Sequence, residues 1–320
     1  MSNSPFAPNP ALAARWGDLR PALGVAFAGR LAELREGAGR DRLHPAAAIP
    51  AAVVAQLVAE FKLTDAREAA LLALDTAAAL ARAPISGYRV GVAGIGALSG
   101  DLLLGGNLEF PGAAIAHTVH AEGFATLLAR ARGEHLAVLA STQARPCAHC
   151  RQILAEMDGA WSLQLIDPQG HELGLNDLFP WPFAPGDLGE VGARAAAGDR
   201  VPLAQASVAE GVPADVAAAL TAVSARAHAP YSRDRAAVVL RLGDGSLIGG
   251  AVLESVAFNP TIGPLADALV ALDAAGRGSA AIREAWIGVR RGAVVNHEAP
   301  ARDLLAAVAP TVRLQTTYWA

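Results

Sequence analysis

Cysteine, lysine and aromatic residues are scarce in this chain of 320 residues. Cys147 and Cys150 are the only cysteines, too few for the disulfide framework of a small secreted protein. A lone C-x-x-C pair indicates instead metal binding or redox chemistry in a reducing compartment. The length predicts about two domains of ~150 residues, each large enough to fold without disulfides.

An excess of positive charge is also missing. The chain has 26 basic and 30 acidic residues, a net charge of −4, and a single lysine, Lys62. Proteins that bind polymeric nucleic acid usually carry a basic stripe, so we expect no such partner. A nucleoside-sized ligand stays compatible with this charge.

Long apolar runs are missing too, although hydrophobic residues make up 53% of the sequence. Pro50 and Gln56 interrupt residues 45–61, and Asp75 interrupts residues 69–81, so no run reaches the ~18 residues of a spanning helix. The N-terminal segment lacks the basic-then-apolar order of a signal peptide. We expect a soluble, cytoplasmic protein without a membrane partner.

Apolar spacing divides the chain into a helical first part, to about residue 45, and two mixed regions. The expected helices and strands are residues 10–16, 22–36, 47–61 and 64–82 (helices, the last capped by Thr64), 88–98 and 101–107 (a hairpin), 115–132 (helix), 135–141 (strand), 147–157 (helix) and 161–166 (strand). A Pro- and Gly-rich linker is expected at 179–198. After it, a helix, a hairpin and a second helix follow in the same order.

Short segments recur at a nearly constant spacing along the two mixed regions. The matched segments are Arg82–Ser86 with His228–Ser232 (offset 146), Gly105-Gly106 with Gly249-Gly250 (offset 144) and Glu109 with Glu254 (offset 145). Such offsets across a helix, a hairpin and a second helix indicate an internal duplication. Each copy combines strands and helices, which predicts an α/β layered fold with a mixed sheet.

His120-Ala121-Glu122 and Pro146-Cys147-x-x-Cys150 carry the chemistry that the sequence suggests. One imidazole and two thiolates form a tetrahedral zinc site with one open position, the arrangement of catalytic zinc. Both cysteines lie at an expected helix start, where the helix dipole favours thiolates. At the start of its own helix, Glu122 can lean towards the same site and transfer protons.

The cysteine pair and the nearby histidines are also compatible with other interpretations. The cysteine pair alone is equally compatible with a redox pair, which would need neither His120 nor Glu122. His117 and His149 are rival ligands, but a spare histidine beside a metal is more often a supporting or surface residue. The combined pattern H-x-E…P-C-x-x-C is the signature of zinc deaminases, and it favours catalytic zinc.

With these motifs the chain resembles the zinc-dependent cytidine deaminases, specifically their long, duplicated, homodimeric type. The matching segments are Ala83–Ser86, Gly106–Phe110, Thr118–Glu122, Pro146–Gln152, Ala229–Ser232 and Ala257–Thr261. The resemblance implies a duplicated three-layer α/β/α fold with a mixed sheet and a small N-terminal helical segment. The expected domains are residues 1–45 (N-terminal segment), 46–185 (catalytic zinc domain) and 186–320 (a repeat without zinc ligands).

The resemblance also implies the site residues and the reaction. One Zn²⁺ per chain would be held by His120, Cys147 and Cys150, with Glu122 as proton shuttle. Cytidine or deoxycytidine would be converted to uridine or deoxyuridine and ammonia, as in pyrimidine salvage. Among the residues implied to contact the nucleoside are Asn107 and Glu109 (ribose), the backbone at Ala121 (base), and Phe258, which the second copy would lend to the partner subunit. The alternative for Asn107 and Glu109 is an ordinary turn at a strand end.

Two departures from the family pattern limit these implications. At offset 144 His120 corresponds to Pro264 and Glu122 to Ala266, so the second copy cannot bind zinc in the same way. Arg82 replaces an aromatic residue and Arg145 a small hydroxyl residue of the family pattern. Arg82 and Arg145 motivate one alternative, deamination of another aminated nucleoside, nucleotide or base. The alternatives from other classes are a non-catalytic zinc-binding dimer and a redox protein.

Overall fold

The computed structural model describes residues 6–37, 46–142, 145–196 and 211–319. Contacts within the chain divide it into two units. The first unit consists of Met1–Ala83, Gly87–Asn107 and His120–Pro182, and the second of Pro84–Ser86, Leu108–Val119 and Phe183–Ala320. The domain limits expected from the sequence stay a prediction.

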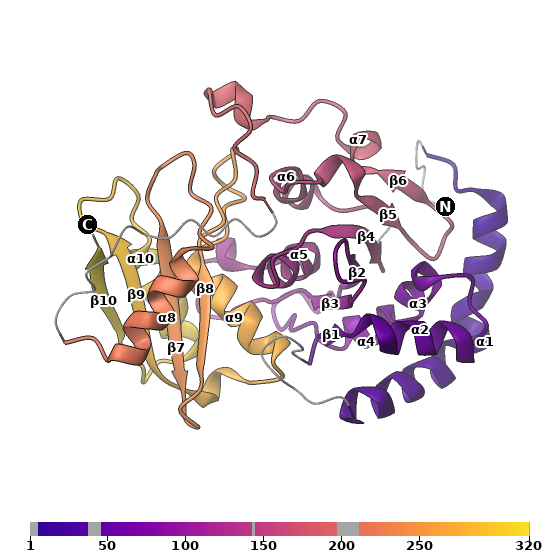
Figure 1. Cartoon of the computed structure of the whole chain (residues 1–320), viewed down its shortest axis with the longest axis horizontal. Helices are drawn as coiled ribbons and strands as arrows, with labels where there is room; N and C mark the ends of the chain where they lie inside the picture. Colours follow the sequence, from indigo (N-terminus) through magenta and orange to yellow (C-terminus); the bar gives the residue numbers. More distant parts are fainter. Residues whose placement is uncertain (1–5, 38–45, 143–144, 197–210, 320) are drawn as a thin grey trace. The chain divides into compact units, whose positions relative to one another are not determined.

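A six-stranded mixed sheet forms the centre of the first unit (Figure 1). Its strands are β1 (Ala48–Ile49), β2 (Gly91–Gly96), β3 (Leu102–Gly106), β4 (Leu136–Ser141), β5 (Gln164–Ile166) and β6 (Glu172–Gly174). Their order is β1-β3-β2-β4-β5-β6; β4 and β5 run parallel, and all other neighbours run antiparallel. The expected hairpin at residues 88–107 is confirmed as β2 and β3.

Helices cover both faces of this sheet. The helices of this unit are α1 (Pro10–Gly37), α2 (Ala51–Glu60), α3 (Ala66–Leu72), α4 (Leu74–Ala78), α5 (Ala121–Ala131), α6 (Ala148–Ala155) and α7 (Leu175–Leu178), with a 3-10 turn at Ala160–Ser162. Of these, α1 packs mainly on α3. A Cβ atom at Gly105 of β3 would lie 2.8 Å from the carbonyl oxygen of Ala121 in α5. On the other face, a Cβ at Gly91 of β2 would lie 2.4 Å from the backbone nitrogen of Ala78 in α4. Gly91 pairs with Gly106, the neighbour of Gly105, so α4 and α5 lie on opposite faces.

Three expectations for the N-terminal helices were wrong in detail. The helix α1 continues through Pro21, since Trp16, Leu19 and the residues Phe27 and Leu31 are buried on both sides of that proline. The helix expected at 47–61 begins only after the short strand β1, with Pro50 as its N-cap. The helix expected at 64–82 is divided into α3 and α4 at Ala73, and Asp65 rather than Thr64 caps it. None of the helices in the described parts of the chain is long and apolar enough to cross a bilayer.

The second unit contains a four-stranded mixed sheet with the order β10-β9-β7-β8. Its elements are β7 (Ala236–Leu242), β8 (Leu247–Ala251), β9 (Ile282–Arg290) and β10 (Leu314–Trp319), the helices α8 (Ala214–Ser224), α9 (Pro264–Ala274) and α10 (Glu298–Val308), and 3-10 turns at Ile115–His117, Pro185–Leu188 and Ser279–Ala281. A Cβ at Gly249 would meet Val223 of α8, and a Cβ at Gly250 would meet Ala268 of α9. Helices therefore cover both faces here too, and the duplicated α/β/α fold with mixed sheets is confirmed.

The two sheets repeat each other down to their irregularities. The pairing of β2 with β4 shifts between Ile95 and Gly96, and that of β7 with β9 shifts between Arg241 and Leu242. Each sheet also has one parallel pair, β4 with β5 and β9 with β10. Such matching bulges support a duplication because bulges are specific features of a sheet.

The structure corrects the residue matching between the copies by one position, for the glycines as well as for the zinc-site residues. A Cβ at Gly105 would meet the first turn of α5 and a Cβ at Gly250 the first turn of α9, so Gly105 corresponds to Gly250 instead of Gly249. His120 is the N-cap of α5, and Gly263 is the N-cap of α9. His120 therefore corresponds to Gly263 instead of Pro264, and Glu122 to Leu265 instead of Ala266. The loop before the helix is shorter in the second unit, and a constant offset cannot account for that. The conclusion that the second copy lacks these zinc-site residues is unchanged.

Candidate metal centre

Three side chains that can bind a metal converge at the starts of two helices in the first unit. The Nδ1 atom of His120 lies 3.2 Å from the Sγ atom of Cys150 and 3.4 Å from that of Cys147, and the two Sγ atoms are 3.5 Å apart. Tetrahedral zinc with bonds of ~2.0 Å to nitrogen and ~2.3 Å to sulfur separates such donors by about 3.5–3.8 Å. The donor set and its spacing therefore fit zinc.

Local structure explains why these side chains are available. His120 and Cys147 are the N-caps of α5 and α6, and neither side chain makes a capping hydrogen bond. Cys150 is in the first turn of α6 and is 2% exposed. The helix α5 packs closely on the sheet at Gly105, which fixes its start, and α6 packs on α5. Both helix starts are thus held by the fold, with their cap side chains free for a metal.

Glu122 occupies the second position of α5 and is 6% exposed. Burial raises the pKa of its carboxyl group, and hydrogen bonding to Cys150 together with the charge of His120 partly opposes this rise. These influences of Cys150 and His120 on Glu122 agree with its predicted position near the three donors. A carboxyl group with a raised pKa is suited to accept and return a proton near neutral pH.

The two thiols differ in their tendency to ionise. Hydrogen bonding to Cys150 and His120 lowers the pKa of Cys147 to about 3. The hydrogen bond to Cys147 and burial raise the pKa of Cys150, and the thiolate of Cys147 raises the pKa of His120. A dication entering this group would displace the remaining thiol proton, because zinc binds thiolates.

The two rival histidines have other surroundings. The ring of His149 stacks on that of His120, with centroids 5.5 Å apart, and burial lowers the pKa of His149. His117 belongs to the second unit, where its Nε2 atom lies 3.1 Å from Asp303. Neither belongs to the group of three metal-binding side chains among the described residues.

Asn107 and Glu109 both hold neighbouring backbone in place. The side chain of Asn107 accepts a hydrogen bond from Val90 N (2.9 Å) and donates one to Tyr88 O (3.0 Å). The carboxylate of Glu109 accepts hydrogen bonds from the backbone nitrogens of Ile85 and Ser86 and from the Ser86 hydroxyl. These bonds, the one from the Ser86 hydroxyl first, lower the pKa of Glu109. Each side chain thus organises a turn, whatever further role it has.

The second sequence copy repeats this turn without a metal site. Glu254 accepts hydrogen bonds from the backbone nitrogens of Tyr231 and Ser232 and from the Ser232 hydroxyl. Ser86 was not among the site residues expected from the sequence, although the repeat of Ser86 as Ser232 marked the position. Phe258 lies nearby with a left-handed backbone (φ 60°) and a side chain that is 62% exposed, its ring centroid 6.4 Å from that of Tyr231.

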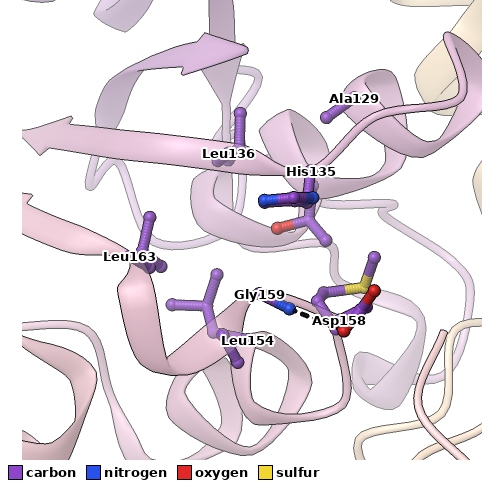
Figure 2. A pocket seen from close by; sticks show the side chains of 10 residues that line it. Ala129, His135, Leu136, Leu154, Asp158, Gly159 and Leu163 are labelled. Atoms are coloured by element: carbon purple, nitrogen blue, oxygen red, sulfur yellow. Dashed lines mark hydrogen bonds between the residues drawn. The ribbon is translucent and has the colours of Figure 1, made fainter. Parts of the chain in front are cut away.

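A small cavity in the first unit is separate from these residues. Figure 2 shows it between His135, Leu136, Leu154, Gly159 and Leu163. Its interior space is about 10 Å³, which suits one water molecule and is far too small for a nucleoside. None of the proposed site residues lines it, so this cavity is not a substrate site.

Comparisons with known proteins agree with the site. Residues 64–161 and 175–302 each match a family model described as "Cytidine and deoxycytidylate deaminase zinc-binding region". The first match contains all three metal-binding side chains and Glu122, and the second contains none of them.

Relatives that match about three quarters of the chain are named cytidine deaminase, and so are solved structures that match about a third of it. The cytidine deaminase of Vibrio atlanticus is 35% identical over 75% of this chain and 79% of its own. That of Pectobacterium carotovorum subsp. carotovorum is 34% identical over 78% of this chain and 82% of its own. The crystal structure of cytidine deaminase from Mycobacterium leprae matches with 28% identity and a TM-score of 0.32, over 36% of this chain and 98% of that one. With two deaminase regions and relatives at this identity over about three quarters of its length, the chain belongs to the cytidine deaminase family.

Proposed function

We propose that this protein deaminates cytidine and deoxycytidine hydrolytically, giving uridine or deoxyuridine and ammonia. The observation that carries the proposal is the buried carboxyl group of Glu122 beside a group of three side chains that fits zinc. A purely structural zinc site has four protein ligands and no use for a neighbouring carboxylate. Three ligands and an acid suit hydrolysis.

The chain holds the metal and supplies a proton carrier. Zinc, when bound, lowers the pKa of a coordinated water towards ~7 and so provides a nucleophile at neutral pH. His120, Cys147 and Cys150 would hold the metal. Glu122 would take a proton at the attacking water, deliver a proton to N3 of the ring, and later protonate the departing amine at C4.

Hydrolysis balances without another reactant. Water adds at C4, the C4–N bond breaks, and the amino group leaves as ammonia. The same carboxyl group can serve each transfer because its pKa is raised towards the working pH by burial. The backbone at Ala121 and Pro146 would contact the base and keep C4 at attack distance.

The sugar would be bound by Asn107 and Glu109. In each side chain the observed hydrogen bonds leave further capacity, since an amide offers two N–H donors and a carboxylate about four acceptor sites. Their turns fix both side chains before a ligand arrives. Pre-fixed polar groups select for a substrate hydroxyl because its absence would leave them unpaired.

Assembly and location complete the proposal. We infer a homodimer in which Phe258 of the second unit completes the site of the partner subunit. Its exposed ring and left-handed backbone support a role in contact, because such backbone strain concentrates at functional positions. A cytoplasmic location fits the two unpaired cysteines, which need a reducing compartment to bind metal.

The test compares wild type with Glu122→Gln at equal zinc content. Each protein is given cytidine, deoxycytidine, cytidine monophosphate and cytosine, and loss of ultraviolet absorbance is measured together with ammonia release. We expect wild type to convert the two nucleosides, and the variant to lose about 10²–10⁴-fold in kcat while retaining zinc. Conversion of only the nucleotide or the base would assign the enzyme to another aminated substrate, and unchanged turnover by the variant would refute the role of Glu122.

A further inference from the structure

The three metal-binding side chains are not held equally firmly. Cys150 lies inside α6 and is 2% exposed, so helix hydrogen bonds and packing fix its position. Cys147 is the N-cap of the same helix, so its carbonyl group alone takes part in the helix hydrogen bonding, and its side chain is exposed. The position of its Sγ atom therefore depends on the two peptide groups on either side of its Cα atom.

Arg151 binds both of these peptide groups. Its Nε atom donates a hydrogen bond to the carbonyl oxygen of Pro146 (2.8 Å), in the peptide before Cys147. Its backbone nitrogen donates to the carbonyl oxygen of Cys147 (3.0 Å), in the peptide after it. Because peptide groups are planar, fixing both carbonyls fixes the direction in which the Cα–Cβ bond of Cys147 points.

The same guanidinium group connects this turn to a second element. Its Nη1 atom donates to the carbonyl oxygen of Leu178 (2.7 Å), the last residue of α7. Pro146 and Leu178 are both buried, so these carbonyl groups have little access to water. A buried carbonyl without a partner is destabilising. One rigid, planar side chain thus satisfies two such carbonyls, a geometry that lysine cannot reproduce.

We propose that Arg151 is a positioning residue for the metal, and that it holds Cys147 at the distance that zinc requires. Zinc–sulfur bonds vary little around ~2.3 Å, so a small displacement of an exposed ligand weakens binding. Residues that orient metal ligands typically contribute 10–100-fold to metal affinity when they are replaced. Arg151 acts through the backbone of Cys147 and needs no contact with substrate.

The variants are chosen to separate geometry, charge and general stability. Arg151→Met removes all side-chain hydrogen bonds at similar length, and Arg151→Lys keeps the positive charge without the planar fork. The matched control is Arg302→Met in the second unit. Arg302 lies on α10, the counterpart of α6, and its Nη1 atom likewise donates to a backbone carbonyl, that of Leu314 (2.9 Å).

The measurement is zinc transfer from the full-length, zinc-loaded protein to a chelating dye, with the melting temperature recorded for zinc-loaded and zinc-free protein. We expect Arg151→Met to lower zinc affinity about 10–100-fold and Arg151→Lys to lower it nearly as much. Arg302→Met should leave zinc affinity at the wild-type value. The difference in melting temperature between loaded and zinc-free protein should shrink only in the Arg151 variants.

Three results would overturn the proposal. Wild-type zinc affinity in Arg151→Met would show that the hydrogen bonds do not position Cys147. Wild-type affinity in Arg151→Lys would show that positive charge alone is sufficient. An equal loss of affinity in Arg302→Met would show that general loosening of the protein, instead of this contact, releases the metal.

Discussion

The two units of this protein have the same frame and different helix starts. In both, a glycine of the central hairpin lets a helix approach the sheet closely, Gly105 under α5 and Gly250 under α9. At the start of these helices the first unit has His120 and the second has Gly263. Close packing of a helix on the sheet is thus common to both units, whereas, among the described residues, the metal-binding side chains are present in only the first.

A second comparison concerns the carboxylates that organise a turn. Glu109 and Glu254 accept the same set of hydrogen bonds, from two backbone nitrogens and a serine hydroxyl. Glu254 is 5% exposed, whereas Glu109 is only partly buried. The repeated turn belongs to the fold itself. Because Glu109 is more exposed, a ligand could reach its carboxylate.

Replacing a metal ligand should give the largest difference between the units. Cys150→Ala removes one of three protein ligands, and a third of the ~10–16 kcal/mol of a protein zinc site is about 3–5 kcal/mol, or roughly 10²–10⁴-fold in zinc affinity. We expect the purified variant to contain little zinc, measured by elemental analysis, and to lose deamination. Pro300→Ala is the matched change, since Pro300 has the same place after the N-cap of α10. Equal zinc loss in both variants would contradict the assignment of the metal to the first unit.

Replacing the glycines that lie against a helix, Gly250 and Gly105, should give the next largest effect, a loss of stability. A Cβ at Gly250 would lie 2.1 Å from the backbone nitrogen of Ala268 and 2.4 Å from the carbonyl oxygen of Pro264. A Cβ at Gly105 would lie 2.8 Å from the carbonyl oxygen of Ala121. Overpacking against backbone typically costs 1–3 kcal/mol, so we expect Gly250→Ala to lower the free energy of unfolding by about 3 kcal/mol and Gly105→Ala by about 1–2 kcal/mol.

Urea denaturation followed by tryptophan fluorescence would measure both changes. Gly263→Ala is a suitable control, because its Cβ would meet no atom within 4 Å. A smaller loss in Gly250→Ala than in Gly105→Ala would show that α9 can move away from its sheet more easily than α5.

Features that depend on local spacing were predictable from the sequence. The hairpin of β2 and β3 follows from two apolar runs around a turn, and the metal site follows from H-x-E and C-x-x-C at helix starts. The mixed sheets follow from alternating strands and helices in each copy. In each case the residues that determine the feature are close together in the sequence or belong to a motif with defined chemistry.

Features that depend on tertiary contacts were not predictable in this way. The helix α1 passes through Pro21 because buried residues on both sides anchor it, and local rules place a break there. The strand β1 has two residues and exists only because it pairs with β3. The role of Arg151 depends on Leu178, which is distant in sequence. The match of His120 to Gly263 required the helix N-caps, since a loop length differs between the copies.

Replacing the turn carboxylates Glu109 and Glu254 should give the smallest difference in the free energy of unfolding between the two copies, and the most informative one. Glu254→Ala leaves the backbone nitrogens of Tyr231 and Ser232 without their acceptor at a buried position, so we expect a loss of about 2–3 kcal/mol in the free energy of unfolding. Glu109→Ala exposes the matching nitrogens of Ile85 and Ser86 to water, which can replace the carboxylate. Its loss should stay near 0.5–1 kcal/mol.

The effects on KM should have the opposite order to the effects on stability, with the larger change of KM in Glu109→Ala. This difference separates a role of the turn in substrate binding from its role in folding. Glu109→Ala should raise KM for cytidine without a matching loss of stability, whereas Glu254→Ala should lose stability and keep KM near the wild-type value once folded. Urea denaturation and steady-state kinetics on the same preparations would test both statements. If Glu109→Ala lost as much stability as Glu254→Ala and kept its KM, the carboxylate would serve the fold equally in both sequence copies. The sugar would then need another partner, because a group used only for folding cannot discriminate between substrates.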